Sequence, residues 1–315
     1  MSDHFLGREH GSPSFSPSAE PLLRVTPGAG DRITFETDDL AYAQMEEHGD
    51  LALVTATINP VTGPVYVEGA EPGDVLAVTI HAIDVAEQGW SVSIPGAGAL
   101  SEVMGPEFFV RRVPVRDGRV QLTDTLDCAA APMIGCLGVA PADVDGSTVM
   151  PTYPTGGNMD LTDARVGSTV YLPVQVPGAL LSVGDLHAVM ARAESTFVAI
   201  EIAGTATLSV DLIKGRSIRA PQVDTGDEWV CVGLGDPVQD SIVMAYESLY
   251  SVMVDQHGWS RDDAYVVLSA LGHTELGGPT GSSDPDPLHP FRAVGAVTLA
   301  RIAKDVLLSA RPTHA

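Results

Sequence analysis

Two short stretches of the sequence each carry two polar side chains separated by one residue. Asn158 and Asp160 stand in Gly-Gly-Asn-Met-Asp, and Asp185 and His187 stand in Gly-Asp-Leu-His. In a β-strand, residues i and i+2 project from the same face, so each pair would point to one side of an extended chain. Carboxylate and imidazole groups that meet in this way suit Zn²⁺ or a similar ion.

Turn chemistry also explains these residues. Glycines permit positive φ angles, and the side chain of an Asn or Asp beside them commonly caps its own backbone. Asp185 follows Val183-Gly184 and would close a turn there, with His187 held by a backbone carbonyl. The residues alone favour turns, so a metal site is at this point one of two open interpretations.

A glutamate further along the chain is a candidate proton-transfer group. Glu201 lies in the apolar run Phe-Val-Ala-Ile-Glu-Ile, where an unpaired buried carboxylate would be costly. Burial would raise its pKa into the range that is useful for a general base near neutrality. Strand alternation also allows Glu201 to face solvent, and the residues do not decide between the two.

Other charged side chains have mainly structural explanations. Glu36, Asp38 and Asp39 follow an alternating strand pattern, where surface charge is the simpler account, although Glu36 or Asp39 would be able to reach a site. His273 and Glu275 form another i, i+2 pair just after an expected helix end, where the helix dipole favours a protonated histidine. The residues alone assign neither group to a site.

Composition describes a globular protein with many acidic residues. The chain has 315 residues, 44% of them hydrophobic and 18% charged, which is enough to bury a substantial core. Its formal net charge of −24 at pH 7 would repel nucleic acid and anionic membranes, so we expect neither as a partner. The N-terminus lacks the basic start and apolar block of a secretory signal, and no apolar run reaches membrane-spanning length.

The three cysteines indicate a reducing compartment. Cys128, Cys136 and Cys231 are an odd number without metal-ligand spacing, so we expect a cytoplasmic protein and no disulfide framework. A nucleophilic cysteine would need an activating base nearby, and none is apparent along the sequence. We therefore expect the cysteines to act as small buried apolar side chains.

Short strands dominate the predicted structure as far as residue 235. Residues 1–21 are rich in Ser, Pro and Gly and show no periodicity, which predicts a flexible N-terminal arm. Residues 22–235 alternate apolar and polar side chains between turn signals, which predicts a β-rich body in which Pro173 marks a strand edge or bulge. The expected strands lie at 31–39, 73–83, Val110–Val115, Thr169–Val176, Thr196–Ile202 and Thr205–Ile213.

After residue 235 the periodicity becomes helical. Asp236-Pro237 with Gln239 has the pattern of a helix N-terminus. Residues 277–290 have the composition of a loop. We expect residues 236–315 to be a helical or α+β part that completes the same fold. The expected helices lie at about 236–258, 260–272 and 294–308.

Several longer phrases stand in a fixed order along the chain. They are "VTGPVYVEGAEPGDVLAV" (61–78), "MIGCLGVAP" (133–141), "PTGGNMDLTDARVGSTVYLPVQVPGALLSVGDLHA" (154–188) and "AIEI" (199–202). Together they resemble the acetamidase/formamidase family, from roughly Leu23 to Ala270. Any one phrase is a weak signal, whereas their order and separation make a specific one.

The resemblance implies a fold and an activity. It implies a mainly β protein, a β-sandwich of jelly-roll character joined to a smaller α+β part with C-terminal helices. It further implies a homo-oligomer, with a dimer favoured. Members hydrolyse small amides to a carboxylic acid and ammonia, and divalent metal is found in members. We therefore expect a metal-dependent amidase acting on a non-peptide carbon–nitrogen bond of a small molecule, with Zn²⁺ favoured over Ca²⁺ or another ion.

The resemblance also implies roles for particular residues. The expected metal ligands are Asp160, Asp185 and His187, and the expected catalytic groups are Glu194, Glu201 and Asn158. Glu194 or Glu36 would complete the shell of the metal. The metal would lower the pKa of bound water and polarise the substrate carbonyl. One of the two catalytic glutamates would act as general base, and the asparagine would donate a hydrogen bond to the oxyanion.

The chain departs from the family pattern at several points, which marks it as a divergent member. Residues 190–194, Met-Ala-Arg-Ala-Glu, stand where Gln-Gly-Asp-Gly-Glu is usual, and Ala97 stands where a bulky ring is usual, which predicts a larger pocket. "GHTELGG" (272–278) replaces an acidic-Leu-Arg piece and is a candidate specificity loop. Two alternatives follow: another reaction at the same site, such as a lyase, a cyclisation or hydrolysis of a bulkier intermediate, or a non-catalytic scaffold.

Overall fold

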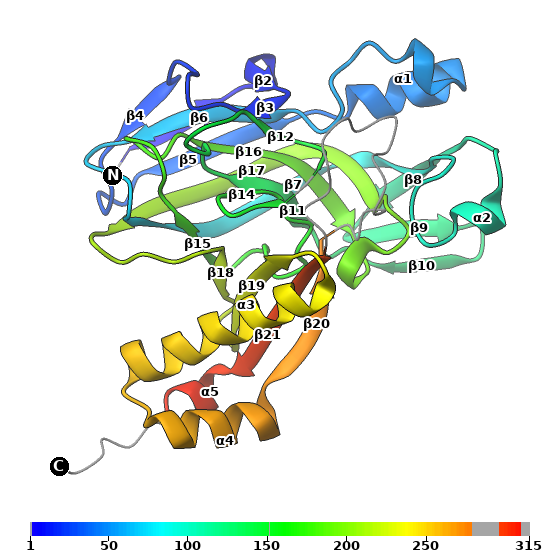
Figure 1. The fold of residues 1–315 in the computed structure, drawn as a ribbon. Coiled ribbons are helices and arrows are strands. Elements are labelled where there is room, and N and C mark those ends of the chain that lie inside the picture. The colour runs from blue at the N-terminus through cyan, green and yellow to red at the C-terminus, as the bar shows by residue number, and fades with distance from the viewer. Residues whose placement is uncertain (1, 151, 279–295, 310–315) are drawn as a thin grey trace.

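The structure is a computed structural model that describes residues 2–150, 152–278 and 296–309. Nineteen of the described strands join in one sheet, and β3 (Ser14–Phe15) and β12 (Gly146–Ser147) pair separately. The sheet is mostly antiparallel and curls around a core of Val, Leu and Ile side chains, while the helices are few and lie outside it (Figure 1). The expected mainly β class is confirmed in the form of a large curled sheet.

Two long strands run through the whole body. β7 (Val75–Ser93) and β17 (Ile200–Ile213) pair antiparallel along most of their length. The segments 196–202 and 205–213, expected as two strands, therefore contribute to one. The other strands of the body are β1 (Asp3–Leu6), β2 (Gly11–Ser12), β4 (Leu23–Val25), β5 (Arg32–Thr37), β6 (Val61–Val67), β8 (Phe109–Arg116), β9 (Arg119–Thr123), β10 (Leu126–Ala129), β11 (Met133–Gly138), β13 (Thr152–Tyr153), β14 (Gly156–Asn158), β15 (Thr169–Pro173), β16 (Leu181–Val189) and β18 (Gln222–Asp224).

The N-terminal segment belongs to the sheet. β1 pairs with β5 and β2 pairs with β6, whereas a flexible arm was expected for residues 1–21. Leu6 and Phe15 are buried in this arrangement. The expectation is wrong for residues 3–15 because too few apolar residues are present to give a local period, while the edge of a distant strand supplies the hydrogen bonds.

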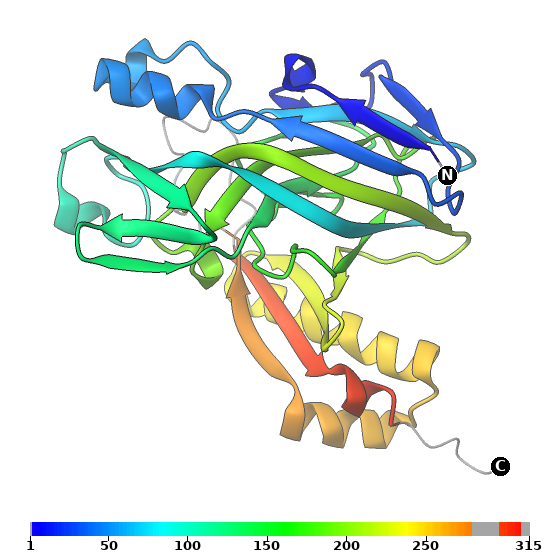
Figure 2. The same ribbon diagram turned by 180° about the vertical axis from the view of Figure 1, so that it is seen from behind.

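The C-terminal part is a three-stranded ladder covered by helices. β19 (Glu228–Gly235), β21 (Ala296–Ala303) and β20 (His273–Gly277) pair antiparallel in that order. Seen from behind, these strands and their helices project below the curled body (Figure 2). The helices and helical turns of the chain are α1 (Leu40–His48), α2 (Ser101–Met104), α3 (Val238–Ser251), α4 (Arg261–Leu271), α5 (Lys304–Leu307), η1 (Arg8–His10), η2 (Leu51–Leu53), η3 (Arg192–Glu194) and η4 (Val252–Gln256).

Two of the three expected C-terminal helices form. The side chain of Ser260 caps α4 by accepting from the backbone N–H of Asp263. α3 begins at Val238 after Pro237, without a capping hydrogen bond from a side chain. The helix expected over 294–308 is wrong, because residues 296–303 form β21 between β19 and β20 and only the four residues of α5 are helical.

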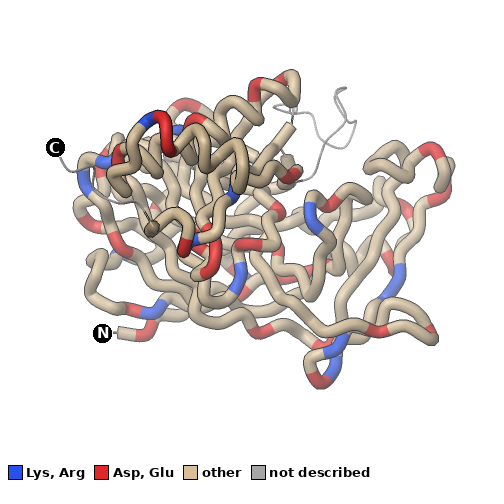
Figure 3. The backbone as a smooth tube through the Cα atoms, turned by 90° about the horizontal axis from the view of Figure 1, so that it is seen from below, with Lys and Arg blue, Asp and Glu red and all other residues tan. Residues whose placement is uncertain are grey.

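The remaining global properties agree with the composition. Figure 3 shows Asp and Glu along most of the described backbone and Lys and Arg at fewer places, in keeping with the net charge of −24. None of the described helices is long and apolar enough to cross a membrane. Most of the loop expected at 277–290, from residue 279 onward, lies outside the described residues.

Candidate active site

Two of the expected ligands lie on β16, in the middle of the sheet. This strand pairs with β6, β11 and β17. Asp185 has a φ of 58°, in the left-handed region, and the ladder to β11 has no pair at that residue. His187 lies directly opposite Glu201 of β17. An irregular strand thus brings these three side chains to one cavity.

The third expected ligand lies just beyond β14. Asp160 has a φ of 43°, and its backbone N–H donates to the carbonyl of Gly135 at 3.2 Å. Asn158 donates from Nδ2 to the carbonyl of Val149 at 2.6 Å, and its Oδ1 accepts from the Cys136 thiol at 3.2 Å. Turn-like backbone angles and converging carboxyl groups therefore occur together, so the two interpretations of the sequence are not exclusive.

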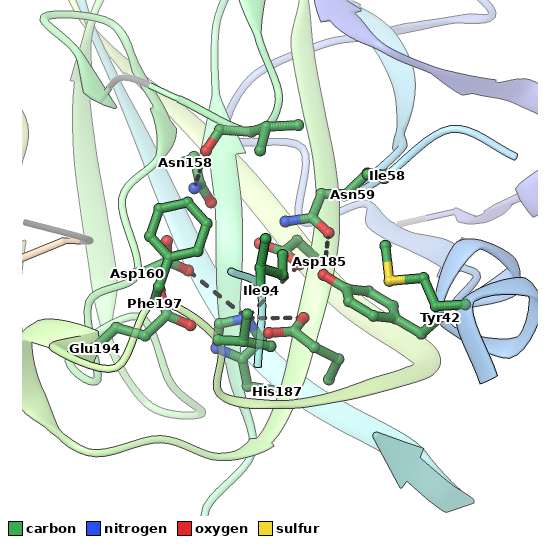
Figure 4. A pocket seen from close by; sticks show the side chains of 14 residues that line it. Tyr42, Ile58, Asn59, Ile94, Asn158, Asp160, Asp185, His187, Glu194 and Phe197 are labelled. Atoms are coloured by element: carbon green, nitrogen blue, oxygen red, sulfur yellow. Dashed lines mark hydrogen bonds and ion pairs between the residues drawn. The ribbon is translucent and has the colours of Figure 1, made fainter. Parts of the chain in front are cut away.

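The imidazole of His187 lies at the centre of the cluster. Its Nε2 is 3.6 Å from Asp185 Oδ1, 3.7 Å from Asp160 Oδ1 and 3.3 Å from Glu201 Oε2. Ligand atoms of His187, Glu194 and Glu201 also lie within 4.8 Å of one another. All five side chains are buried and line the same cavity (Figure 4). The structure thus brings together Asp160, Asp185, His187, Glu194 and Glu201, whereas Glu36, the alternative to Glu194, does not line this cavity.

A glycine makes room for two of the carboxylates. A Cβ atom at Gly135 of β11 would lie 2.5 Å from Asp185 Oδ2 and 2.6 Å from Asp160 Oδ1. Any side chain there would displace one or both of these groups. The sequence indicated Gly135 only as part of a family phrase, because the need for a missing side chain depends on contacts from two distant segments.

The cavity is small and has one apolar wall. The cavity volume is about 30 Å³, which is room for one or two waters. Ala97, where the sequence predicted a larger pocket, does not line the cavity; it packs in the same apolar cluster as Phe197, which does. Besides the ionisable cluster and Asn158, the lining residues are Tyr42, Met45, Ile58, Asn59, Ile94, Val149, Phe197 and Val198.

Helix α1 contributes part of this wall and was not expected from the sequence. Tyr42 of α1 is buried and donates from its hydroxyl to Asn59 Oδ1 at 2.6 Å. The sequence of α1 is a short run of mixed apolar and polar residues, which gives no clear helical period. Asp39, just before the helix, accepts from Trp90 Nε1 at 2.7 Å and from the backbone of Ala203. These hydrogen bonds hold α1 beside the cluster.

Burial and mutual repulsion dominate the electrostatics of the cluster. Burial, reinforced by Asp185 and opposed by His187, raises the pKa of Asp160 to about 7. Burial and the charge of Glu201 raise the pKa of Asp185 to about 6. Burial and Asp160 raise the pKa of Glu194 well above its usual range. For His187, burial favours the neutral ring most strongly, but Glu201 and Asp185 raise its pKa overall.

This donor set fits a divalent metal. Four carboxyl groups share one buried imidazole, so their negative charge needs bound protons or a cation. Asp160 Oδ1 and His187 Nδ1 make no hydrogen bond within the described part of the chain. Carboxylate oxygens with one imidazole nitrogen are ligands that Zn²⁺ accepts, and harder ions accept the oxygens. The identity of the ion does not follow from the donors.

The other candidate residues do not line the cavity. Glu36 accepts from the backbone N–H of Arg8 at 3.2 Å and does not line the cavity. His273 and Glu275 lie on β20 in the C-terminal part. Cys136 is beside the cluster, but burial raises the pKa of its thiol far above the usual range, in keeping with an inert buried cysteine. The described residues contain no disulfide.

The chain is thus a β-rich protein in which a curled, mostly antiparallel sheet buries one imidazole among four carboxyl groups. The chain is 29% identical to a predicted acetamidase/formamidase from Thermoanaerobacter tengcongensis, with a TM-score of 0.85 over 98% of this chain and 99% of that one. For an acetamidase from Bacillus halodurans, the identity is 29% and the TM-score 0.82, over 96% and 98%.

The family model for acetamidase/formamidase proteins matches residues 8–144 and 119–272, and the chain belongs to this family. It is 30% identical over 263 residues to an acetamidase from Mycolicibacterium smegmatis, and the match covers 63% of this chain and 65% of that protein. The chain spans 60% to 65% of the length of the three curated relatives that it matches.

Proposed function

We propose that this protein is a metal-dependent amidase that hydrolyses the carbon–nitrogen bond of a small amide to a carboxylic acid and ammonia. The observation that carries the proposal is the cluster of four buried carboxyl groups around one imidazole at a small cavity, in a member of the acetamidase/formamidase family. A cytoplasmic location and a homo-oligomer, with a dimer favoured, stay predictions from the sequence.

In this proposal, Asp160, Asp185 and His187 hold the ion. Glu194 completes the shell, since it lies within the same cluster while Glu36 pairs with Arg8 outside the cavity. When bound, a divalent metal supplies a water of lowered pKa and polarises the carbonyl of the amide. The residues of the chain must then bind the substrate, exclude bulk water and move one proton.

Glu201 is the proposed base. Its Oε1 accepts from the backbone N–H of Ala199 at 3.1 Å, which fixes the carboxylate and leaves Oε2 directed at His187. From this position Oε2 takes the proton of the attacking water and passes it to the leaving nitrogen. Asn158 is the predicted oxyanion donor, and it gives one amide hydrogen to the carbonyl of Val149. A hydrogen bond from Asn158 to Asp160 lowers the pKa of that carboxyl group, so its second hydrogen must leave Asp160 before it can reach the oxyanion.

The cavity favours a short substrate. An acyl chain of one or two carbons approaches the size of the cavity, whereas the bulkier intermediate considered as an alternative would require Tyr42, Ile94 or Phe197 to move. These side chains also keep bulk water from the polar groups, which strengthens electrostatic interactions inside the site.

Removal of metal tests the proposal directly. Purified protein is treated with chelator and assayed for ammonia release from formamide, acetamide, propionamide and benzamide, before and after addition of Zn²⁺ or Ca²⁺. We expect activity that falls with acyl size, that is lost with the metal and that one ion restores. Unchanged turnover after complete metal removal would rule out the metal role.

A matched pair of variants tests the assignment of the base. Glu201→Gln keeps the shape of a cavity side chain and should lower kcat by roughly 10²–10⁴-fold, the usual contribution of general base catalysis. Glu36→Gln changes a candidate that pairs with Arg8 outside the cavity and should leave kcat near the wild-type value. Equal effects of the two changes would contradict the assignment.

A further inference from the structure

A chain of ion pairs connects the C-terminal part to the body close to the cluster. Arg301 of β21 reaches Asp163 Oδ2 through Nη2 at 2.5 Å. Its Nε lies 3.4 Å from Glu275 Oε2 of β20. The same Glu275 oxygen accepts from Arg192 Nη1 at 2.6 Å. Four side chains, from Asp163 through Arg301 and Glu275 to Arg192, thus form one continuous network.

Both ends of this network lie beside residues of the proposed metal site. Asp163 comes three residues after Asp160, and Arg192 comes two residues before Glu194. Asp163 and Arg301 are buried, whereas about half of the Arg192 side chain is exposed to solvent. The C-terminal strands therefore hold, through side chains, the two segments that deliver Asp160 and Glu194 to the cavity.

The segment that carries Glu194 needs such support. In η3, Ala193 has a φ of 67° and Glu194 a φ of 41°, both in the left-handed region that non-glycine residues rarely adopt. A conformation of this kind persists only where surrounding contacts hold it. Arg192 points outward to Glu275 while Glu194 points into the cavity, so the ion pair fixes the outer side of the same turn.

We propose that Arg192, Glu275 and Arg301 are positioning residues that set the distance between Glu194 and Asp160 and thereby the affinity of the site for its metal. This inference rests on the proposed function, since it requires a metal at the cluster. It also gives a role to the two stretches that depart from the family pattern, residues 190–194 and 272–278, because Arg192 lies in the first and Glu275 in the second.

The partly exposed pair of Arg192 and Glu275 allows an effect on metal binding to be separated from an effect on overall stability. Ion pairs near the surface contribute little to overall stability, so loss of the Arg192 side chain should leave the unfolding temperature almost unchanged. Residues that orient metal ligands commonly change metal affinity 10- to 100-fold when they are substituted. A change in metal binding without a change in unfolding temperature is therefore what a positioning role predicts and a purely structural role does not.

The experiment measures the Kd for Zn²⁺ by competition with a chromophoric chelator, together with the unfolding temperature and kcat. Arg192→Gln should weaken Zn²⁺ binding 10- to 100-fold, and Arg192→Lys, which retains the charge, should recover much of the loss. The control is Arg219→Gln, because Arg219 forms a pair of the same length, 2.6 Å, with Glu247, and the side chain of Arg219 is similarly exposed. It should bind Zn²⁺ as the wild type does.

Each other outcome is decisive. Wild-type affinity and kcat in Arg192→Gln would overturn the positioning role, and so would an equal loss in the Arg219→Gln control. A wild-type protein that binds no Zn²⁺ and shows no other metal-dependent amidase activity would instead overturn the proposed function, before any variant is compared.

Discussion

Two buried aspartates three residues apart show how differently one fold treats the same side chain. Asp160 is 2% exposed and Asp163 is 4% exposed. Asp163 meets the guanidinium of Arg301, which also contacts Glu228. Asp160 meets the carboxyl groups of the cluster and a single imidazole. Both lose their hydration, but only one has a permanent cation as partner.

The difference separates a structural ion pair from a binding site. A buried carboxylate paired with a guanidinium is balanced in the folded protein, and removal of the cation leaves an uncompensated charge. A buried carboxylate among other carboxylates is balanced only by protons or by a ligand of positive charge. Burial raises the pKa of both aspartates, but Arg301 opposes the rise at Asp163, whereas the charge of Asp185 reinforces it at Asp160, whose pKa is raised to about 7. Of the two, Asp160 is the carboxyl group without a permanent cation, and this is why we propose it as a metal ligand.

The largest effect should come from removing the permanent cation. Arg301→Met leaves Asp163 buried and unpaired, so the metal-free protein should lose about 3–5 kcal/mol of its free energy of unfolding. Asp160→Asn removes one of the clustered carboxyl groups and should leave the metal-free protein unchanged or more stable at pH 8. Urea unfolding of both variants with chelator present measures the change in the free energy of unfolding, which should be a loss for Arg301→Met and zero or a gain for Asp160→Asn. Destabilisation of both by similar amounts would contradict the distinction drawn here.

A smaller effect should appear in the dependence of stability on pH. The pKa of Asp160 is raised from 3.8 to about 7 and that of Asp185 to about 6. Between pH 4 and 7 the folded protein therefore holds protons that the unfolded chain has released, so its stability falls as pH rises. The pKa of His187 is also raised, so the folded protein holds this proton above the pH at which the unfolded chain releases it. Stability therefore falls further as pH rises above the usual range of histidine. Each group contributes at most about 1.4 kcal/mol per pH unit.

Unfolding of the metal-free protein at pH 5 to 8 checks this, with Asp160→Asn as control for the many surface carboxylates. The variant should show a shallower fall, because it lacks one titrating group. Added Zn²⁺ should stabilise the wild type more at pH 8 than at pH 5, since metal binding displaces protons from the ligands. A wild type and variant with parallel pH profiles would mean that Asp160 does not titrate as argued.

Local patterns predicted much of this molecule. Alternation predicted β5 and β8, and the helix expected at about 260–272 forms as α4. The helix expected over residues 294–308 failed because Val297, Leu299 and their neighbours suit either period, and pairing with two strands decided for β21. Such a decision depends on partners that lie far away in the sequence.

Some residues of the candidate site were predictable from the sequence, and others depend on contacts with distant segments. Spacing and family phrases selected Asp160, Asp185 and His187, whereas Glu201 stayed ambiguous between core and solvent until its pairing opposite His187 was known. Same-face spacing assumes regular strands, yet Asp160 and Asp185, two of the proposed ligands, have left-handed φ angles where their carboxyl groups converge. No local signal marks Tyr42, because its role comes from the placement of α1 against another segment.

The smallest predicted effect concerns Gly135, the glycine that makes room for the carboxylates of Asp160 and Asp185. Gly135→Ala places a methyl group within 2.6 Å of carboxylate oxygens of Asp160 and Asp185, so these groups must move apart. We expect roughly a tenfold weaker Kd for Zn²⁺, about 1.4 kcal/mol. Gly146→Ala is the control, because its nearest neighbour lies at 3.3 Å and belongs to Pro141, away from the cluster. Unchanged affinity in Gly135→Ala, measured by the same chelator competition, would mean that the carboxylates need not approach as closely as this cavity brings them.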